Sequence, residues 1–334
     1  MAKIVTLGEI MMRLSTPRHE RIIQANSFEI TFGGGEANVA VSLAQYGHEA
    51  CFVSKLPQNA LGDKVIASLR GAGVNTAGIV RGGNRLGVYF LETGAAMRPS
   101  SVVYDRANSA IAEAEVSDFD FDAIFEGADI FHICGITPAI SQKGALLAET
   151  AMKAAKAKGV TVSFDINFRS KLWSVAQAAE VLPKLLPYAD ICFGNAWDAR
   201  NLLKLNISED ADFETGARAM AEAFGLQYVI ASHRVSHSAS NNDLSASIYT
   251  KEEDKVYTSR TYSITPIVDR VGGGDSLAAG VLCGVADGKA CPEIIEFGVA
   301  ASALKHTIHS DYNMISRAEV ETLMQGDGSG KVQR

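Results

Sequence analysis

The middle of the chain shows short apolar runs that alternate with longer segments in which apolar residues recur at helical spacing. Such continuous apolar runs are typical of strands that are buried on both faces of a parallel sheet. The predicted strands are 129–134, 161–165, 191–194 and 228–231, and the predicted helices are 141–158, 174–186, 198–204 and 213–224. The alternation favours an α/β fold in which helices cover both faces of a mostly parallel sheet.

The N-terminal part begins in the same way and then departs from this rhythm. The pattern predicts a strand at 4–7, a Gly-rich turn followed by a helix that ends near Gly47, a strand at 51–54 and a helix at 61–69. Segments 87–92 and 101–104 alternate like the strands of a hairpin, and residues from about 10 to 32 alternate loosely. These segments predict a small β flap that lies outside any helix.

Composition changes this picture only in excluding some classes of protein. The 334 residues are 47% hydrophobic, and the net charge of −7 argues against nucleic acid as the main partner. The five cysteines form no CxxC pair and lie mostly in apolar runs, as reduced core thiols do. No signal-peptide core and no apolar run of the ~20 residues that a membrane span needs is present. We therefore expect a cytoplasmic protein without a membrane segment.

The length allows about two domains, or one large α/β domain with an appendage. We expect a single domain over residues 1–325, with a β lid formed by about 10–33 and 86–108. Residues 326–334 are rich in glycine and lack apolar periodicity, so we expect a flexible tail there.

Ligands of parallel sheets bind beyond the carboxyl ends of the strands. The polar residues just past the predicted strand ends are therefore the candidates for function. They are Glu9, the segment 165–169, Asn195, the segment 232–234 and the segment 269–275.

The segment 268–276 contains three consecutive glycines, Gly272, Gly273 and Gly274, before a helix predicted from Ser276 to Val285. A Gly-rich turn at a helix N-terminus presents unpaired N–H groups that bind anions, most often phosphate. The adjacent Asp275 has two interpretations: a base that removes a proton from a hydroxyl, or an N-cap after a flexible turn. No Lys-Ser/Thr follows the glycines, so the segment is not a Walker A loop.

Three further groups of residues also have two interpretations each. The glycines before Asn38 can let a sugar lie against the backbone, or they can form an ordinary turn. Arg169, after a buried strand, suits a carboxylate or a phosphate, or a structural salt bridge. Tyr89, Tyr104 and Arg106 on the flap can face a sugar acid, or they can be ordinary strand residues.

Asn195 and Asp198 follow a predicted strand. They can hold a water-coordinated Mg²⁺, but Asn195 is also a standard N-cap, and the cap is the favoured interpretation. The seven histidines show no HExxH pattern, and no metal ligand set is assigned.

Two segments together resemble the two signatures of the ribokinase-like (PfkB) sugar kinases. The first is Gly34-Gly35 with Asn38 and Gly47, and the second runs from Asp269 through Gly272–Asp275 to Gly280. The resemblance extends from about residue 8 to residue 306. It implies a three-layer, Rossmann-like domain with a small β lid, ATP-dependent phosphorylation of a sugar hydroxyl, and ATP and Mg²⁺ as cofactors. It also allows a monovalent cation near Asp269 and oligomers that pair through the lid.

The resemblance implies a role for individual residues. Asp275 would be the catalytic base, and Gly272, Gly273 and Gly274 the anion hole. The implied substrate-binding residues are Gly34, Gly35, Asn38, Tyr89, Tyr104, Arg106, Arg169 and Asp275. The implied cofactor-binding residues are Asn167, Asn195, Ser232, Arg234, Ser236, Gly272 and Gly274.

Within this family the segments 104–106 and 165–169 look most like those of 2-keto-3-deoxygluconate kinases. We therefore expect phosphorylation of the terminal hydroxyl of this sugar acid, giving the 6-phosphate. A fructokinase- or ribokinase-type enzyme for neutral sugars and an inactive sugar-binding protein are the alternatives. The chain departs from the family at Arg270, where a small residue is usual, at Pro57, where a Gly is usual, at Asp198, where a Glu is usual, and in the segment 232–234, which lacks the usual Gly.

Overall fold

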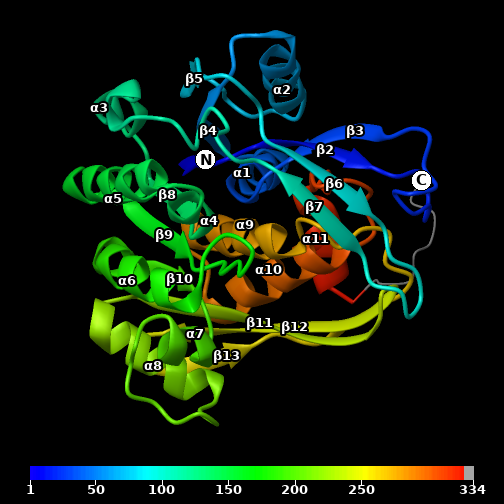
Figure 1. Cartoon of the computed structure of the whole chain (residues 1–334). Helices are drawn as coiled ribbons and strands as arrows, with labels where there is room; N and C mark the ends of the chain where they lie inside the picture. Colours follow the sequence, from blue (N-terminus) through cyan, green and yellow to red (C-terminus); the bar gives the residue numbers. More distant parts are fainter. Residues whose placement is uncertain (327–334) are drawn as a thin grey trace.

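The computed structural model describes residues 1–326 and contains two sheets, a large central one and a smaller one beside it (Figure 1). The predicted flexible tail lies outside the described residues, apart from its first glycine. None of the described helices is long and apolar enough to span a bilayer.

The central sheet has ten strands, and its middle is parallel, as the alternation of strands and helices predicted. The order along the main path is β13-β12-β11-β10-β9-β8-β1-β4-β5, with β14 paired to β12. The strands are β1 (Lys3–Leu7), β4 (Glu49–Leu56), β5 (Ile79–Arg81), β8 (Ile130–Cys134), β9 (Thr161–Asp165), β10 (Ile191–Phe193), β11 (Tyr228–Ser238), β12 (Asn241–Thr250), β13 (Lys255–Thr258) and β14 (Tyr262–Ile264). Pairing is parallel from β5 to β11 and antiparallel from β11 to β13.

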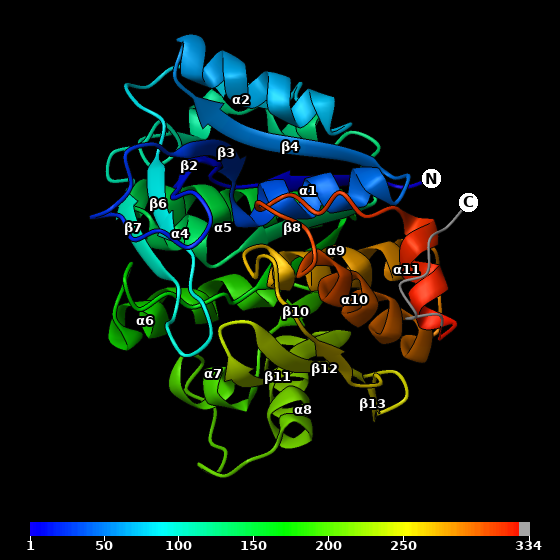
Figure 2. The ribbon, with the colours of Figure 1, turned by 90° about the vertical axis from the view of Figure 1, so that its right-hand side faces the viewer.

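Helices cover both faces of this sheet, so the predicted three-layer fold is confirmed (Figures 1 and 2). One apolar core lies under α1 (Gly35–Gln45), α2 (Ala60–Gly71), α9 (Gly273–Ala286), α10 (Cys291–Lys305) and α11 (Arg317–Met324). The core on the other face lies under α5 (Gln142–Ala157), α6 (Val175–Leu185), α7 (Ala196–Asn201) and α8 (Phe213–Phe224). Two short helices, α3 (Phe121–Ile124) and α4 (Ile136–Ala139), lie in the connections around β8.

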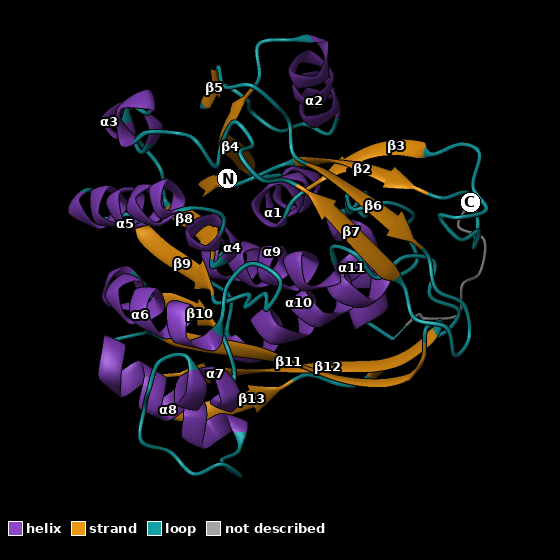
Figure 3. Cartoon of the chain, in the orientation of Figure 1, coloured by secondary structure: helices purple, strands orange, loops and turns teal. Residues whose placement is uncertain are grey.

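The small sheet has four strands in the order β3-β2-β6-β7 (Figure 3). They are β2 (Met11–Ser15), β3 (Glu29–Gly33), β6 (Val88–Glu92) and β7 (Ser101–Asp105), all within the segments in which we expected a lid. Arg13 and Tyr89 point to the buried face of this sheet, whereas Leu14, Phe90 and Val103 alternate to the other face. That the sheet moves as a lid stays a prediction.

The C-terminal third holds most of what the pattern did not predict. β11 continues seven residues beyond the predicted end at 231, so residues 232–238 belong to the strand. It pairs with β12, and neither β12–β14 nor α10 and α11 was predicted. The extension of β11 is polar and exposed, and its strand form depends on pairing with β12, which a local pattern does not show.

Candidate active site

The two Gly-rich turns meet at the starts of α1 and α9, which pack against each other (Figure 2). Nδ2 of Asn38 donates to Oδ2 of Asp275 at 2.7 Å. A Cβ placed on Gly35 would lie 3.7 Å from Oδ1 of Asp275, so the first turn passes directly beside this carboxylate. The two segments that resemble kinase signatures therefore form one site.

The second glycine turn forms the beginning of α9. The helix starts at Gly273, three residues before the predicted start, and Gly272 is its N-cap with a φ of 83°. No side chain caps this helix, so the interpretation of Asp275 as an N-cap is wrong. Gly272 is required here, because L residues rarely adopt this φ and a Cβ would lie 2.5 Å from the carbonyl oxygen of Asp311.

Gly274 is the open position of the turn. It is exposed, and a Cβ added to it would meet no protein atom within 4 Å. Because the first turn of a helix leaves its N–H groups without intrahelical partners, the space beside Gly274 suits an anion.

Several carboxyl groups at this site have raised pKa values, namely those of Asp275, Asp165, Glu36 and Asp311. Burial raises the pKa of Asp275 to about 6, while the hydrogen bond from Asn38 and the charge of Arg169 act in the opposite direction. Burial, together with the charge of Asp275, raises the pKa of Asp165 to about 7. A carboxylate with a pKa near 6 is ionised at neutral pH and basic enough to accept a hydroxyl proton as a bond to phosphorus forms.

One large cavity of about 940 Å³ contains most of the residues that the sequence singled out. The predicted site residues that line it are Gly34, Gly35, Asn38, Tyr89, Tyr104, Arg106, Asn167, Arg169, Ser232, Arg234, Gly272, Gly273, Gly274 and Asp275. Asn195 and Ser236 do not line it. Asn195 caps α7, with its side chain and that of Asp198 hydrogen-bonded to each other's backbone N–H, as the favoured interpretation held.

The two arginines expected to face a sugar acid differ in their partners. Arg106 is ion-paired with the buried carboxylate of Glu9, which also accepts a hydrogen bond from Ser109. Arg169 lines the cavity, and within residues 1–326 its side chain forms one hydrogen bond, to the carbonyl oxygen of Phe168 at 3.3 Å, and no salt bridge, although its charge acts on Asp275 and Asp165. The charge of Arg169 is therefore the one left available to a ligand.

The two tyrosines also differ. Tyr89 is buried, and its hydroxyl lies 2.6 and 2.8 Å from the two carboxylate oxygens of Asp311. Tyr104 is 42% exposed, and its ring lies 6.0 Å from that of Tyr89 between centroids. Within residues 1–326 the hydroxyl of Tyr104 forms no hydrogen bond and can bind a ligand, whereas Tyr89 offers only its ring.

Two further arginines also line the cavity. Arg234 and Arg270 both line it, and the charge of Arg234, after burial, lowers the pKa of Arg270. One nitrogen of Arg270, Nη2, donates to the carbonyl oxygens of Ser238 and Ala239, at 3.1 and 2.8 Å. Neither arginine forms an ion pair with an acidic group of the described chain, so the pair suits an anionic ligand.

The sequence did not point to four buried polar residues around the glycine turn. Arg13, Lys305, His306 and Asp311 are almost fully buried, and Asp311 and His306 line the cavity. Arg13 alternates with apolar residues along β2, and this alternation is the one signal that could have placed it on the inner face.

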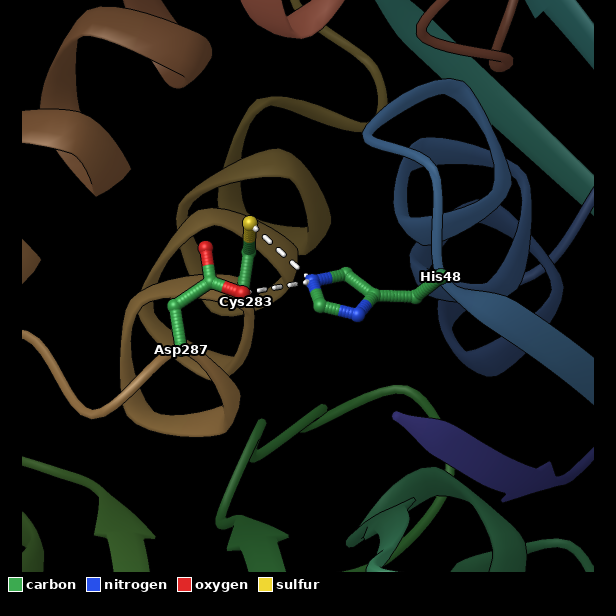
Figure 4. Close-up of side chains that lie close together, drawn as sticks. All are labelled: His48, Cys283 and Asp287. Atoms are coloured by element: carbon green, nitrogen blue, oxygen red, sulfur yellow. Dashed lines mark hydrogen bonds and ion pairs between the residues drawn. The ribbon is translucent and has the colours of Figure 1, made fainter. Parts of the chain in front are cut away.

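One set of side chains in residues 1–326 has the spacing of metal ligands, and it lies elsewhere. His48, Cys283 and Asp287 meet near the C-terminal end of α9, about 18 Å along the helix from Asp275 (Figure 4). Nδ1 of His48 accepts from the N–H of Ala2, so Nε2 carries the proton that points at Cys283 and Asp287. Arg317 already pairs with Asp287, and these contacts indicate a structural cluster.

Comparison with known proteins places this geometry in a family. The sequence pattern of the pfkB family carbohydrate kinases matches residues 1–317. The 2-dehydro-3-deoxygalactonokinase of Haloferax volcanii is 34% identical over 329 residues, which are 98% of each chain. The 2-dehydro-3-deoxygluconokinase of Bacillus subtilis is 26% identical over 307 residues, 90% of this chain and 88% of that one.

Two solved structures are similar over nearly the whole chain. The crystal structure of 2-dehydro-3-deoxygluconokinase from Thermotoga maritima is 44% identical, with a TM-score of 0.93, and the alignment covers 98% of this chain and all of that one. Fructokinase with bound ATP from Xylella fastidiosa is 25% identical, with a TM-score of 0.77 and coverage of 97% and 99%.

Proposed function

Since the chain belongs to the pfkB family of carbohydrate kinases, we propose that it phosphorylates 2-keto-3-deoxygluconate (2-dehydro-3-deoxygluconate) with ATP. The terminal hydroxyl would accept the phosphoryl group, and the products would be the 6-phosphate and ADP. The observation that carries the proposal is that Asp275 and an Arg169 without an acidic partner share one cavity. The first is suited to deprotonate a hydroxyl, and the second to hold a carboxylate.

Asp275 performs the proton transfer in this proposal. Its Oδ2 is held by Asn38, and its Oδ1 faces the Gly35 turn, against which a sugar can lie. As the sugar oxygen attacks the γ-phosphorus, its proton passes to Asp275 and the bond to ADP breaks. The N–H groups of the turn from Gly272 to Gly274 then stabilise the negative charge on the transferring group.

The cavity also fits ATP. The open space at Gly274 leaves room for the phosphates, and Arg234 and Arg270 provide positive charge without acidic partners. Mg²⁺ bound to the phosphates would neutralise part of their charge, and Asp165 is the lining carboxylate suited to hold it through water. The earlier candidates Asn195 and Asp198 do not line the cavity, and the side chain of each accepts a hydrogen bond from the backbone N–H of the other. We therefore place no Mg²⁺ on them.

Substrate choice rests on charge. A guanidinium binds a carboxylate through two parallel hydrogen bonds, and Arg169 lines the same cavity as Tyr104 and Asp275, where it can make them. Arg106, in contrast, is neutralised by Glu9, so it supports the acid less directly than the sequence predicted. A neutral-sugar kinase would leave Arg169 without a partner inside the closed site.

The epimer at C4 is a second candidate substrate, because the Haloferax relative is a 2-dehydro-3-deoxygalactonokinase. The experiment that tests the proposal measures ADP release with a panel of both sugar acids, fructose and ribose. Turnover with either sugar acid above that with fructose and ribose supports it. A preference for fructose or ribose would favour the neutral-sugar kinase, and no turnover with any of the four would favour the inactive sugar-binding protein.

We further propose that two copies of the chain pair through the small sheet. Its outer face carries a row of apolar side chains across neighbouring strands: Ile30, Leu14, Phe90 and Val103. Ile30 and Val103 are 58% and 52% exposed, so a second copy of the same face would bury them. We also propose a cytoplasmic location, because all five cysteines are buried and none of them forms a disulfide.

The monovalent cation that the resemblance allows near Asp269 would have to share its place with two protein cations. Asp269 is paired with Arg13, and the buried Lys305 lies close enough to interact electrostatically with the Asp269 carboxylate. Comparing turnover in potassium and in tetramethylammonium salts tests whether a cation is still needed.

A further inference from the structure

Arg13, on β2 of the small sheet, is completely buried, and its guanidinium joins two carboxylates that lie outside this sheet. Nη2 lies 2.5 Å from Oδ2 of Asp269, Nη1 lies 2.9 Å from Oδ2 of Asp311, and Nε donates to Oγ of Ser15 at 2.6 Å. The two acidic residues are 256 and 298 positions away along the chain. An arginine of a lid strand thus forms a buried ionic bridge to the core.

Both carboxylates are part of the framework of the glycine turn. Oδ1 of Asp269 accepts the N–H of Val271 at 3.0 Å, just before Gly272. A Cβ added to Gly272 would come within 2.5 Å of the carbonyl oxygen of Asp311, and a Cβ added to Gly33 would come within 2.0 Å of Oδ1 of the same residue. Any movement of these carboxylates therefore moves the turn at which the phosphoryl group is transferred.

The small sheet contacts the same carboxylates a second time, through the hydroxyl of Tyr89 on Asp311. Lys305 lies behind the turn, with its Cε 3.3 Å from the Cβ position of Gly272 and its ammonium donating to the carbonyl oxygen of Ile308. The two positive charges of Arg13 and Lys305 thus compensate the two negative charges of Asp269 and Asp311 in one buried cluster. Removing one member of such a cluster leaves an uncompensated buried charge, which is costly.

We infer that Arg13 is a positioning residue, through which the small sheet holds the glycine turn in the geometry for phosphoryl transfer. The inference rests on the proposed kinase function and extends it to a residue that contacts neither substrate. When the sheet lies over the cavity, Arg13 fixes the positions of the Asp269 and Asp311 carboxylates. These carboxylates in turn fix the position of the glycine turn. Without the arginine, the sheet and the turn are no longer placed relative to each other, and water reaches the γ-phosphorus more readily.

The test is Arg13→Met, which keeps most of the side-chain volume and removes the charge. We expect kcat to fall by about 10- to 100-fold, as small displacements of catalytic groups do. We also expect at least about a threefold rise in the phosphate released per sugar phosphate formed, because water then attacks in place of the hydroxyl. This ratio does not depend on the fraction of folded enzyme, so a purely structural loss would leave it unchanged.

Arg21→Met is the matched control, since Arg21, in the connection between β2 and β3, also forms an ion pair with a residue of the small sheet, Glu92, but is exposed. It should leave both kcat and the ratio unchanged. Arg13→Lys retains a charge that reaches one carboxylate at a time, and we expect intermediate values. If Arg13→Met does not fold, kcat and the ratio in Arg13→Lys provide the test.

Two outcomes would overturn the inference while the wild type remains an active kinase. One is a folded Arg13 variant with wild-type kcat, and the other is a lower kcat with an unchanged ratio. A wild type that phosphorylates none of the sugars would instead overturn the proposed function and the inference with it.

Discussion

Asn38 donates its side-chain N–H to Oδ2 of Asp275 at 2.7 Å, and so joins the first turns of two helices that begin 238 residues apart, at Gly35 and Gly273. This single contact fixes one oxygen of the carboxylate and leaves the other free to accept a proton. It also favours the ionised form of a carboxyl whose pKa burial raises. This arrangement is the one that the proposed role of Asp275 as a general base requires.

Asp275→Asn should preserve the fold and ATP binding and lower kcat by about 10²–10⁴-fold, the usual contribution of a general base. The amide has the same shape but cannot accept the hydroxyl proton. Steady-state kinetics with 2-keto-3-deoxygluconate, together with ATP binding by calorimetry, check this. Turnover near that of the wild type would remove Asp275 from the role of base.

The activity should depend on the ionisation of Asp275. Because the pKa of Asp275 is raised to about 6, kcat/KM should fall as the pH falls through this value. Asn38→Ala removes a hydrogen bond to the ionised form, so the pKa should rise further and the fall should begin at higher pH. Rates at constant ionic strength from acid to neutral pH provide the measurement, and a profile that does not move in Asn38→Ala speaks against the assignment.

Gly274→Val should reduce kcat much more than it affects the KM of the sugar. A Cβ at this position meets no protein atom within 4 Å, so we expect the fold to be kept, while the new side chain occupies the space beside the N–H groups proposed to bind the phosphoryl. Gly71→Val is the control, because a Cβ at Gly71 also meets no atom within 4 Å and lies in α2, outside the cavity. A loss confined to the KM of the sugar would contradict the anion-hole role.

Val103→Glu should dissociate an oligomer that forms through the small sheet, since it places a charge at the exposed β7 end of the apolar row. Leu146→Glu on α5 is the control, because Leu146 is exposed to a similar degree, 56% against 52% for Val103. Light scattering after size-exclusion chromatography gives the mass of each variant. An unchanged mass in Val103→Glu, or a monomeric wild type, would exclude pairing through this face.

The local pattern of apolar residues was sufficient to predict those strands and helices whose own apolar residues form the core. β9 and α8 have the predicted bounds, Thr161–Asp165 and Phe213–Phe224. The rule that ligands bind beyond the carboxyl ends of parallel strands also directed attention to Asp165, Arg169 and Asp275, which line one cavity. In these places the periodicity reports burial directly.

The remaining features depend on partners that are distant along the chain. The pairing of Arg106 with Glu9 spans 97 positions, and that of Arg13 with Asp311 spans 298, so neither could be deduced from neighbouring residues. The same holds for Tyr89, whose hydroxyl turns out to bind Asp311. Sequence patterns therefore indicated which residues approach the cavity, but not which of their charges are already neutralised.

The central claim is that Arg169 selects an acidic sugar. A charge-assisted pair of this kind contributes about 1.5–3 kcal/mol, and 1.4 kcal/mol is about tenfold in affinity. Arg169→Ala should therefore lower kcat/KM for 2-keto-3-deoxygluconate by roughly 10- to 100-fold and affect ATP less. Fructose never makes this contact, so discrimination against it should shrink by the same factor.

The most direct measurement is kcat/KM for 2-keto-3-deoxygluconate and for fructose in the wild type, in Arg169→Ala and in the control Arg200→Ala, whose arginine pairs with Glu209 outside the cavity. The rates are measured at a pH well above the pKa of Asp275, which is about 6, because loss of the Arg169 charge would raise that pKa. We predict a wild type and an Arg200→Ala variant that prefer the sugar acid, and an Arg169→Ala variant that has lost most of this preference. A wild type that prefers fructose, or an Arg169→Ala variant that loses both substrates equally, would contradict the assignment as a sugar-acid kinase.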